Sequence, residues 1–238
     1  MKKALQHIAA PVMDFIYPAR CLGCELPIDA ADVLCHRCLA DCMEHPISEA
    51  ASHELLAGMT HPPKATYAAF GFEYEHGGSI ESCIHALKYR GLHRIGVWLG
   101  RLLGERLHGL PHIAGDPVLA PVPLHPLKQT ERGYNQAERL AQGIALETGV
   151  EIRMDILKRT RYTASQAAFQ LDQEERKTNI VRAFAANETA LTSLGDRPII
   201  IVDDVVTSGA TIGECVETFR QYGAWDVRIL AAAHPSKQ

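Results

Sequence analysis

The chain has 238 residues, with 24 Lys and Arg against 28 Asp and Glu, so its formal net charge is −4. A hydrophobic content of 47% excludes a disordered chain, and the acidic balance argues against general nucleic-acid affinity. No apolar run approaches the length of a membrane span, so we expect a cytoplasmic protein with one sizeable domain and a small appendage.

Two closely spaced cysteine pairs stand near the start of the chain. Cys21-x2-Cys24 and Cys35-x2-Cys38 are separated by ten residues, a spacing that brings four thiolates around one tetrahedral Zn²⁺. A closed four-cysteine site is structural, because it leaves no position for a catalytic water. His36 or Cys42 could replace one of the four ligands, and this alternative stays open at the level of sequence.

This metal site predicts a zinc-ribbon-like segment over residues 1–45. Residues 1–60 hold four Lys or Arg against eight Asp or Glu. This acidic balance argues against a nucleic-acid-binding ribbon. The remaining roles for the segment are a structural one, in which the metal holds it folded, or contact with a partner protein. Residues 46–66 contain three prolines and no clear period, which indicates a linker, and residues 67–238 form the main domain.

Strands and helices alternate through the main domain. Aromatic content predicts a strand over 67–74, and helical periods follow over 77–90 and 96–107. A strand over 117–123 leads into a loop over 124–134, and Asn135, with Glu138 three residues on, caps a helix that ends at Gly149. Further elements are expected as strands over 150–157 and 225–233 and as helices over 172–182 and 211–222. This order predicts an α/β fold with a parallel sheet and helices on both faces.

The most informative segment is IIIVDDVVTSGAT, residues 199–211. Four branched apolar residues indicate a strand buried on both faces, and Asp203 and Asp204 follow at its carboxyl end, where ligands bind in open α/β sheets. The turn then opens a helix, where free amides and hydroxyls favour an anion. A sugar phosphate fits, with its phosphate on the turn residues Thr207, Ser208, Gly209, Ala210 and Thr211 and its hydroxyls on the two aspartates. No G-x-x-x-x-G-K-[ST] or G-x-G-x-x-G motif is present, which disfavours P-loop and dinucleotide sites.

This string resembles the phosphoribosyl-diphosphate (PRPP) motif of type I phosphoribosyltransferases, in which two acids hold the ribose hydroxyls and the turn holds the 5′-phosphate. Three further segments look like a narrower group: PVPLHPLKQTERGYNQAERLA over 121–141, LKYRG over 87–91, and the spacing R-x6-Q-x9-R-x2-N. With the cysteine pairs, they resemble the ComF/GntX family of competence and phosphoribosyltransferase-like proteins. The spacing is formed by Arg159, Gln166, Arg176 and Asn179.

That resemblance implies a type I phosphoribosyltransferase fold with an N-terminal zinc ribbon. It implies PRPP with Mg²⁺ as the ligand and DNA uptake during transformation as one process in which relatives take part. Cleavage of the C1′ bond builds negative charge on pyrophosphate, so donors aimed there should lower the barrier. Our catalytic candidates for this task are Arg132 and Arg159. Further candidates, for which loop or cap roles are equally open, are Lys128, Asn135, Gln136, Arg161 and Arg176.

Two classes of function remain. One is an enzyme of the glycosyltransferase class that transfers phosphoribose to an unknown acceptor. The other is a non-catalytic PRPP or nucleotide sensor, or a scaffold for single-stranded DNA that works with other DNA-uptake proteins. Aromatic content of 6% weakens the DNA version but leaves room for a local groove along residues 128–161.

Overall fold

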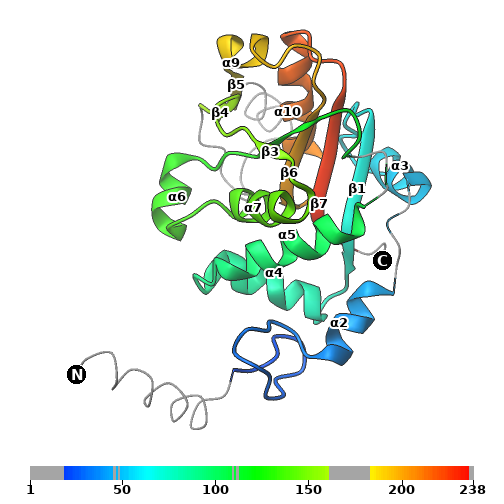
Figure 1. The fold of residues 1–238 in the computed structure, drawn as a ribbon, viewed down its shortest axis with the longest axis vertical. Helices are drawn as coiled ribbons and strands as arrows, with labels where there is room; N and C mark the ends of the chain where they lie inside the picture. The colour runs from blue at the N-terminus through cyan, green and yellow to red at the C-terminus, as the bar shows by residue number, and fades with distance from the viewer. Residues whose placement is uncertain are drawn as a thin grey trace.

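The computed structural model describes residues 19–44, 47, 49–108, 110, 113–160 and 183–235. Within them, parallel strands form a five-stranded sheet in the order β1-β7-β6-β2-β3 (Figure 1). These strands are β1 (Tyr67–Tyr74), β2 (Val118–Pro121), β3 (Glu151–Ile152), β6 (Ile199–Val205) and β7 (Val227–Pro235).

Side chains of the central strand β6 are buried on both faces of the sheet. Ile199 and Ile201 belong to one hydrophobic cluster, while Ile200 and Val202 belong to the other. Successive side chains of a strand point to opposite faces, so an unbroken apolar run needs cover on both. The four residues are each at most 2% exposed, which confirms that this strand is fully buried.

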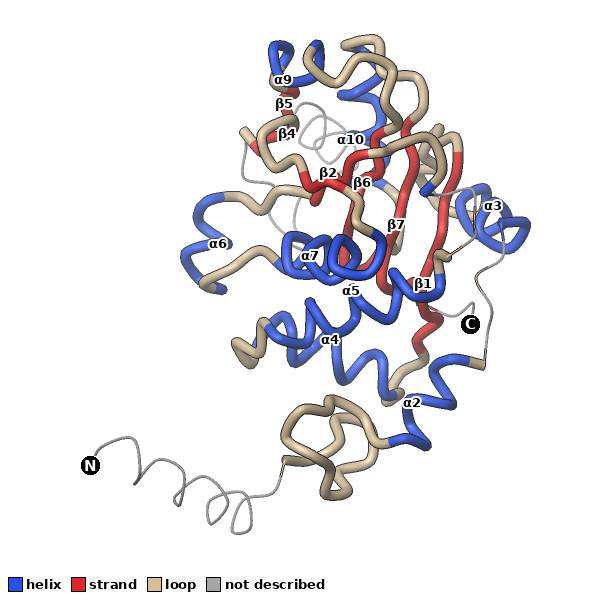
Figure 2. Tube along the Cα trace, viewed as in Figure 1, coloured by secondary structure: helices blue, strands red, loops and turns tan. Residues whose placement is uncertain are grey.

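Helices cover both faces (Figures 1 and 2). One cluster contains residues of α4 (Ser79–Tyr89), α5 (Arg94–Arg106) and α7 (Gln136–Thr148). The other contains residues of α3 (Glu49–Ala57), α9 (Glu188–Thr192) and α10 (Ala210–Gln221). The predicted α/β class is therefore confirmed.

Helices α5 and α7 cross at very short range through glycines. A Cβ placed on Gly100 would lie 2.8 Å from the Cα of Gly143, and a Cβ placed on Gly143 would lie 2.7 Å from the backbone nitrogen of Arg101. Real Cβ atoms do not approach so closely, so these positions accept only glycine. The crossing fixes α7, and with it the residues at its first turn.

The prediction of an irregular loop over 124–134 is wrong. Residues Pro126–Arg132 form α6, which starts with proline in its first turn and ends at Gly133, with φ 78°. The ring Nδ1 of His125 accepts a hydrogen bond from the Leu127 backbone at 3.3 Å and caps this helix. None of its residues is buried, so α6 has no apolar period for a sequence analysis to detect.

Two other boundaries differ from expectation. The expected strand over 150–157 is divided into β3 at the sheet edge and β4 (Leu157–Arg159), which pairs antiparallel with β5 (Phe184–Ala186). Arg153 binds Asp155 at 2.9 Å in the bend between them. The expected linker contains α3, while the helix expected over 172–182 lies outside the described residues.

The N-terminal segment ends with α2 (His36–Met43) and lies beside α4, on the side away from the sheet (Figure 1). Arg20 and Pro27 form an isolated antiparallel bridge there. In the described part of the chain, no helix combines the length and the apolar character needed to cross a bilayer.

Candidate functional site

The ends of two neighbouring strands define the candidate ligand site. β2 and β6 pair in parallel, with Pro121 beside Val202, so their carboxyl ends meet at one edge of the sheet. After β2 the chain forms α6 and then α7, which covers one face of the sheet. After β6 it forms α10, which covers the other face. Chain connections that diverge in this way open a crevice at the strand ends, where ligands bind in α/β sheets.

Asp203 and Asp204 lie at this point and face different helices. The Oδ2 atom of Asp204 is 3.2 Å from Lys88 Nζ on α4, whereas Asp203 acts electrostatically on Cys215 of α10. The Asp204 backbone N–H donates to Asp203 Oδ1 at 2.9 Å. Burial and the charge of Asp204 raise the pKa of Asp203 to about 7. The two carboxylates thus lie on different sides of the strand, as their alternation along β6 predicts.

The turn after β6 is shaped for an anion. Gly209 has φ 80° and is the N-cap of α10, where no side chain caps the helix. Ala210 N–H reaches Ser208 Oγ only at 3.5 Å, so the amides of the first turn keep their capacity for an anionic ligand. Thr207 and Thr211 are exposed at the same turn.

Residues 59–61, which belong to the expected linker, pack against this turn. The His61 backbone N–H donates to the Ser208 carbonyl oxygen at 3.0 Å. A Cβ on Gly209 would collide with the His61 carbonyl and lie 3.1 Å from Met59 Sδ. The His61 side chain is exposed, so the residue contributes through its backbone, which no side-chain pattern reports.

Cations gather beside the acidic pair. Burial lowers the pKa of Lys128 on α6, and the positive charges of Arg159, Arg132 and Lys88 lower it further. A bound anion would relieve this mutual repulsion. The structure thus brings Lys128, Arg132 and Arg159, all three expected from the sequence, into one electrostatic group.

Gln136 adds a buried donor next to these cations. Its Oε1 accepts from Arg132 Nη1 at 3.1 Å, while its Nε2 is buried without a hydrogen-bond partner among the described residues. Buried polar groups are normally paired, so an unpaired amide at this place suits a ligand oxygen.

Asn135 has a different role. Its Oδ1 accepts from the Ala137 backbone and its Nδ2 donates to the Val122 carbonyl, each at 3.0 Å, so the side chain caps α7 and ties it to the end of β2. Three residues of the sequence pattern, Gln166, Arg176 and Asn179, and the candidate Arg161 lie outside the described residues.

Lys88 contacts the candidate site but is missing from the residues expected from the sequence. It belongs to the LKYRG segment, but its position near the end of α4 gives no sign of contact with a strand more than a hundred residues later. Only the fold brings α4 to the carboxyl end of β6.

The four cysteines form a second, separate centre. The Sγ atoms of Cys21, Cys24, Cys35 and Cys38 lie within 4.8 Å of one another, and those of Cys24 and Cys35 are 3.6 Å apart. Tetrahedral zinc with bonds of about 2.3 Å requires sulfur separations of about 3.8 Å, so the cluster fits this ion. Within the described residues, neither Cys42 nor His36 belongs to it.

Backbone amides favour the thiolate form in this cluster. Cys35 N–H donates to Cys21 Sγ at 3.2 Å and Gly23 N–H at 3.4 Å. Burial alone would raise the pKa of the Cys21 thiol, but backbone hydrogen bonds, the largest from Cys35, lower it to about 6. Thiolates are the form that binds metal, so the residues suit a closed structural Zn²⁺ site.

Comparisons with known proteins bear on the ligand turn. A family model described as "Phosphoribosyl transferase domain" matches residues 130–238, which contain the Asp pair and its turn. "Competence protein F" of Haemophilus influenzae is 30% identical over 115 residues, covering 48% of this chain and 49% of that protein. The chain is thus similar to ComF-like proteins over about half of its length.

Other relatives carry related names. "DNA utilization protein YhgH" of Salmonella typhi is 32% identical over 149 residues, covering 61% of this chain and 63% of its own length. "Competence protein ComFC" of Streptococcus pneumoniae is 27% identical over 110 residues, covering 46% of this chain and 44% of that protein. The chain thus spans between 44% and 63% of the length of these relatives.

Proposed function

We propose that this ComF-like chain binds PRPP with Mg²⁺ at the ends of β2 and β6. The observation that carries the proposal is the pairing of two carboxylates with an uncapped helix start in one turn. Asp203 and Asp204 would hold the ribose hydroxyls, and the amides and hydroxyls of residues 207–211 would hold the 5′-phosphate.

The cationic group suits the other end of the ligand. Lys128, Arg132 and Arg159 would face the diphosphate, and Gln136 Nε2 would donate to one of its oxygens. Mg²⁺ bound with the diphosphate would supply further positive charge there. If transfer occurs, these donors favour it, because negative charge grows on the diphosphate as the C1′ bond breaks.

Replacing both aspartates tests the site. Calorimetric titration with PRPP and Mg²⁺ should give binding by the wild type and affinity at least about 100-fold lower for Asp203→Asn/Asp204→Asn. Each lost hydrogen bond to a charged group contributes roughly 1.5–3 kcal/mol, and 1.4 kcal/mol is a factor of ten. The control is Asp196→Asn/Glu217→Gln, two exposed acids, which should bind like the wild type. Equal affinity of the two double variants, or no binding by the wild type, contradicts the proposal.

A second assay separates enzyme from sensor. Release of pyrophosphate from PRPP that depends on an added base or amine would assign transfer and identify the acceptor class. Binding without such release for any acceptor would assign a sensor.

An exposed aromatic residue favours single-stranded DNA as a second candidate ligand. Tyr89 is 67% exposed at the end of α4. The His85 ring lies 4.9 Å from it, and the Arg132 guanidinium lies 5.8 Å above it. Aromatic rings beside cations are how proteins hold unpaired bases, and relatives are named for competence and DNA utilization.

Tyr89→Ala should therefore weaken binding of a fluorescently labelled oligothymidine about tenfold, since stacking contributes roughly 1–3 kcal/mol per base. Anisotropy titrations at several salt concentrations measure this, and affinity should fall as salt rises. Tyr222→Ala removes a 47% exposed tyrosine at the far end of α10 and should leave affinity unchanged. Equal affinity of the Tyr89 and Tyr222 variants would rule out this surface.

A further inference from the structure

Helix α4 joins the four-cysteine centre to the ligand turn. At its first turn, Gly23 of the first cysteine loop packs against Ser79, so closely that a Cβ on Gly23 would lie 3.0 Å from both Ser79 Cβ and Cys38 Sγ and would collide with the Ser79 hydroxyl. Near its last turn, Lys88 binds Asp204. The two ends of one rigid element therefore contact the two centres.

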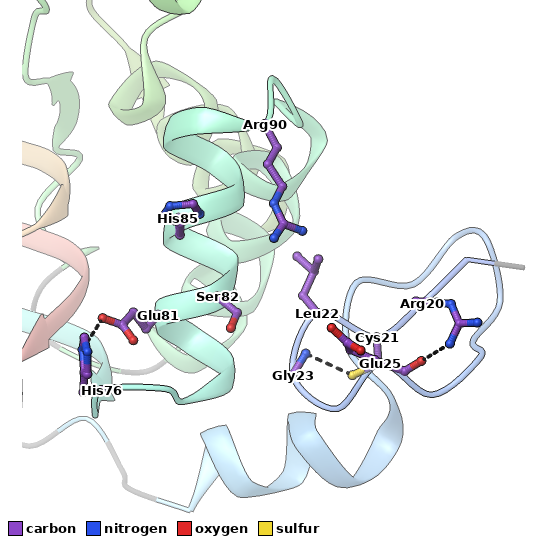
Figure 3. Close-up of a pocket in the computed structure, with 10 residues that line it drawn as sticks. All are labelled: Arg20, Cys21, Leu22, Gly23, Glu25, His76, Glu81, Ser82, His85 and Arg90. Carbon is purple, nitrogen blue, oxygen red and sulfur yellow. Dashed lines mark hydrogen bonds and ion pairs between the residues drawn. The ribbon is translucent and has the colours of Figure 1, made fainter. Parts of the chain in front are cut away.

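The first cysteine loop contacts α4 at that first turn, and Cys21 also shares a buried cluster with Cys83 in the middle of the helix. Figure 3 shows Cys21, Leu22 and Gly23 beside the helix at a cleft of about 580 Å³, with Ser82 and Arg90 on the helix side. A displacement of the loop therefore reaches the helix through Ser79 and through this cluster. Helix α2, which carries Cys38, packs against α4 as well.

The other end of α4 is also fixed. The Tyr134 hydroxyl donates to the Leu87 carbonyl oxygen, next to Lys88, and Tyr134 is itself buried. A half-buried lysine held in this way has little freedom to leave its carboxylate partner: the side chains of Lys88 and Asp204 are 24% and 12% exposed.

Lys88 stands between the acids and the cations of the site. Its charge acts on Asp203, where it favours the ionised form, and on Lys128, where it adds to the repulsion among the cations. The other groups that face Asp203 are Asp204 on the same strand, Arg159 on β4 and Cys215 on α10.

We infer that Lys88 is a positioning residue of the phosphoribosyl site, and that the four-cysteine centre sets its position through α4. The inference rests on the proposed PRPP function. Lys88 holds Asp204 in place and its charge favours the ionised form of Asp203, so that the pair can accept hydrogen bonds from the sugar hydroxyls. A change at Gly23 or Ser79 would then alter ligand affinity without touching a ligand-binding residue.

The pH dependence of binding tests the role of Lys88. Wild-type affinity for PRPP with Mg²⁺ should rise through about pH 7, because Asp203, with a pKa of about 7, accepts hydrogen bonds from hydroxyls only when ionised. Lys88→Met removes the cation that lowers this pKa. Its midpoint should be displaced upward by about one pH unit, so its affinity should fall about fivefold at pH 7 and about tenfold well below pH 7.

Lys88→Arg is the control: it keeps the positive charge, so its affinity should rise with pH at the wild-type midpoint. The phosphates of PRPP titrate identically with every variant, so a difference in midpoint belongs to the protein. An unchanged midpoint for Lys88→Met overturns the role of Lys88. A wild type that does not bind PRPP overturns the proposed function instead, so the two failures are distinguishable.

Gly23→Ala tests the connection to the metal centre. It keeps all four cysteines, so zinc content by metal analysis should stay at the wild-type value while PRPP affinity falls about tenfold at pH 7. Adding Ser79→Gly removes the atoms that collide and should restore affinity. Ser79→Leu crowds the same contact from the helix side and should weaken binding equally, whereas Leu26→Ala changes an exposed residue of the same loop and should not. Wild-type affinity in both Gly23→Ala and Ser79→Leu overturns the connection.

Discussion

Replacing Cys35 and Cys38 with serine is expected to abolish zinc binding and unfold residues 21–44. The two substitutions, made together, remove two of the four zinc ligands, and serine hydroxyls do not replace thiolates at a zinc ion. A segment this short has too few apolar residues for a core of its own, so the metal supplies its folding free energy, roughly 10–16 kcal/mol in small zinc peptides. Metal analysis after dialysis and limited proteolysis of the segment measure both effects.

Cys42→Ser is the control for this experiment. Cys42 is a partly buried thiol on the same helix as Cys38, and burial raises its pKa to about 11, which disfavours the thiolate. Zinc content should therefore stay at one ion per chain. Zinc retained by the Cys35→Ser/Cys38→Ser variant, or lost from Cys42→Ser, would contradict the assignment of the four ligands.

Gly100→Leu is expected to cause the largest loss of stability in the main domain. The new side chain would point into the backbone of α7, where Gly143 Cα lies 2.8 Å from the position of the Cβ, and backbone cannot rotate away as a side chain can. Overpacking of this kind typically costs about 1–3 kcal/mol, and we expect about 4 kcal/mol because several atoms must be accommodated. The melting temperature should fall by about 10 °C.

Gly104→Ala provides a graded comparison on the same helix face. A Cβ here would lie 2.8 Å from Glu147 Cβ and 3.3 Å from the Ile144 carbonyl oxygen, so the crowding is milder than at Gly100, and a single methyl group requires only a small displacement of α7. Alanine also favours a helix by about 1 kcal/mol relative to glycine, so the net change should stay below about 1 kcal/mol. Similar melting temperatures for Gly100→Leu and Gly104→Ala would show that the crossing is more adaptable than the structure indicates.

The parts of this molecule that the sequence predicts are those with a repeating local signal. The run from Ile199 to Val202, the capped start of α7 and the paired cysteines all carry their structure in neighbouring residues. Helices α3 and α6 carry little such signal, because α6 buries none of its residues and the apolar positions of α3 follow no clear period.

The candidate site divides in the same way. The Asp203 to Thr211 turn is contiguous and can be read directly from the sequence. Lys88 and the His61 backbone contact it from segments far away along the chain, so their contribution depends on the sheet order and on how α4 packs. Long-range proximity of this kind is a property of the topology, and no local pattern encodes it.

The position of β1 beside β7 has a consequence for how the chain is made. In the five-stranded sheet, the first strand pairs with the last, from Tyr67 with Arg228 to Tyr74 with Pro235. During synthesis β1 emerges long before its neighbour exists, and its edge stays open until almost the whole chain has left the ribosome. Slow closure of such distant contacts prolongs exposure to aggregation. Shortened chains that end before residue 227 would keep that open edge permanently.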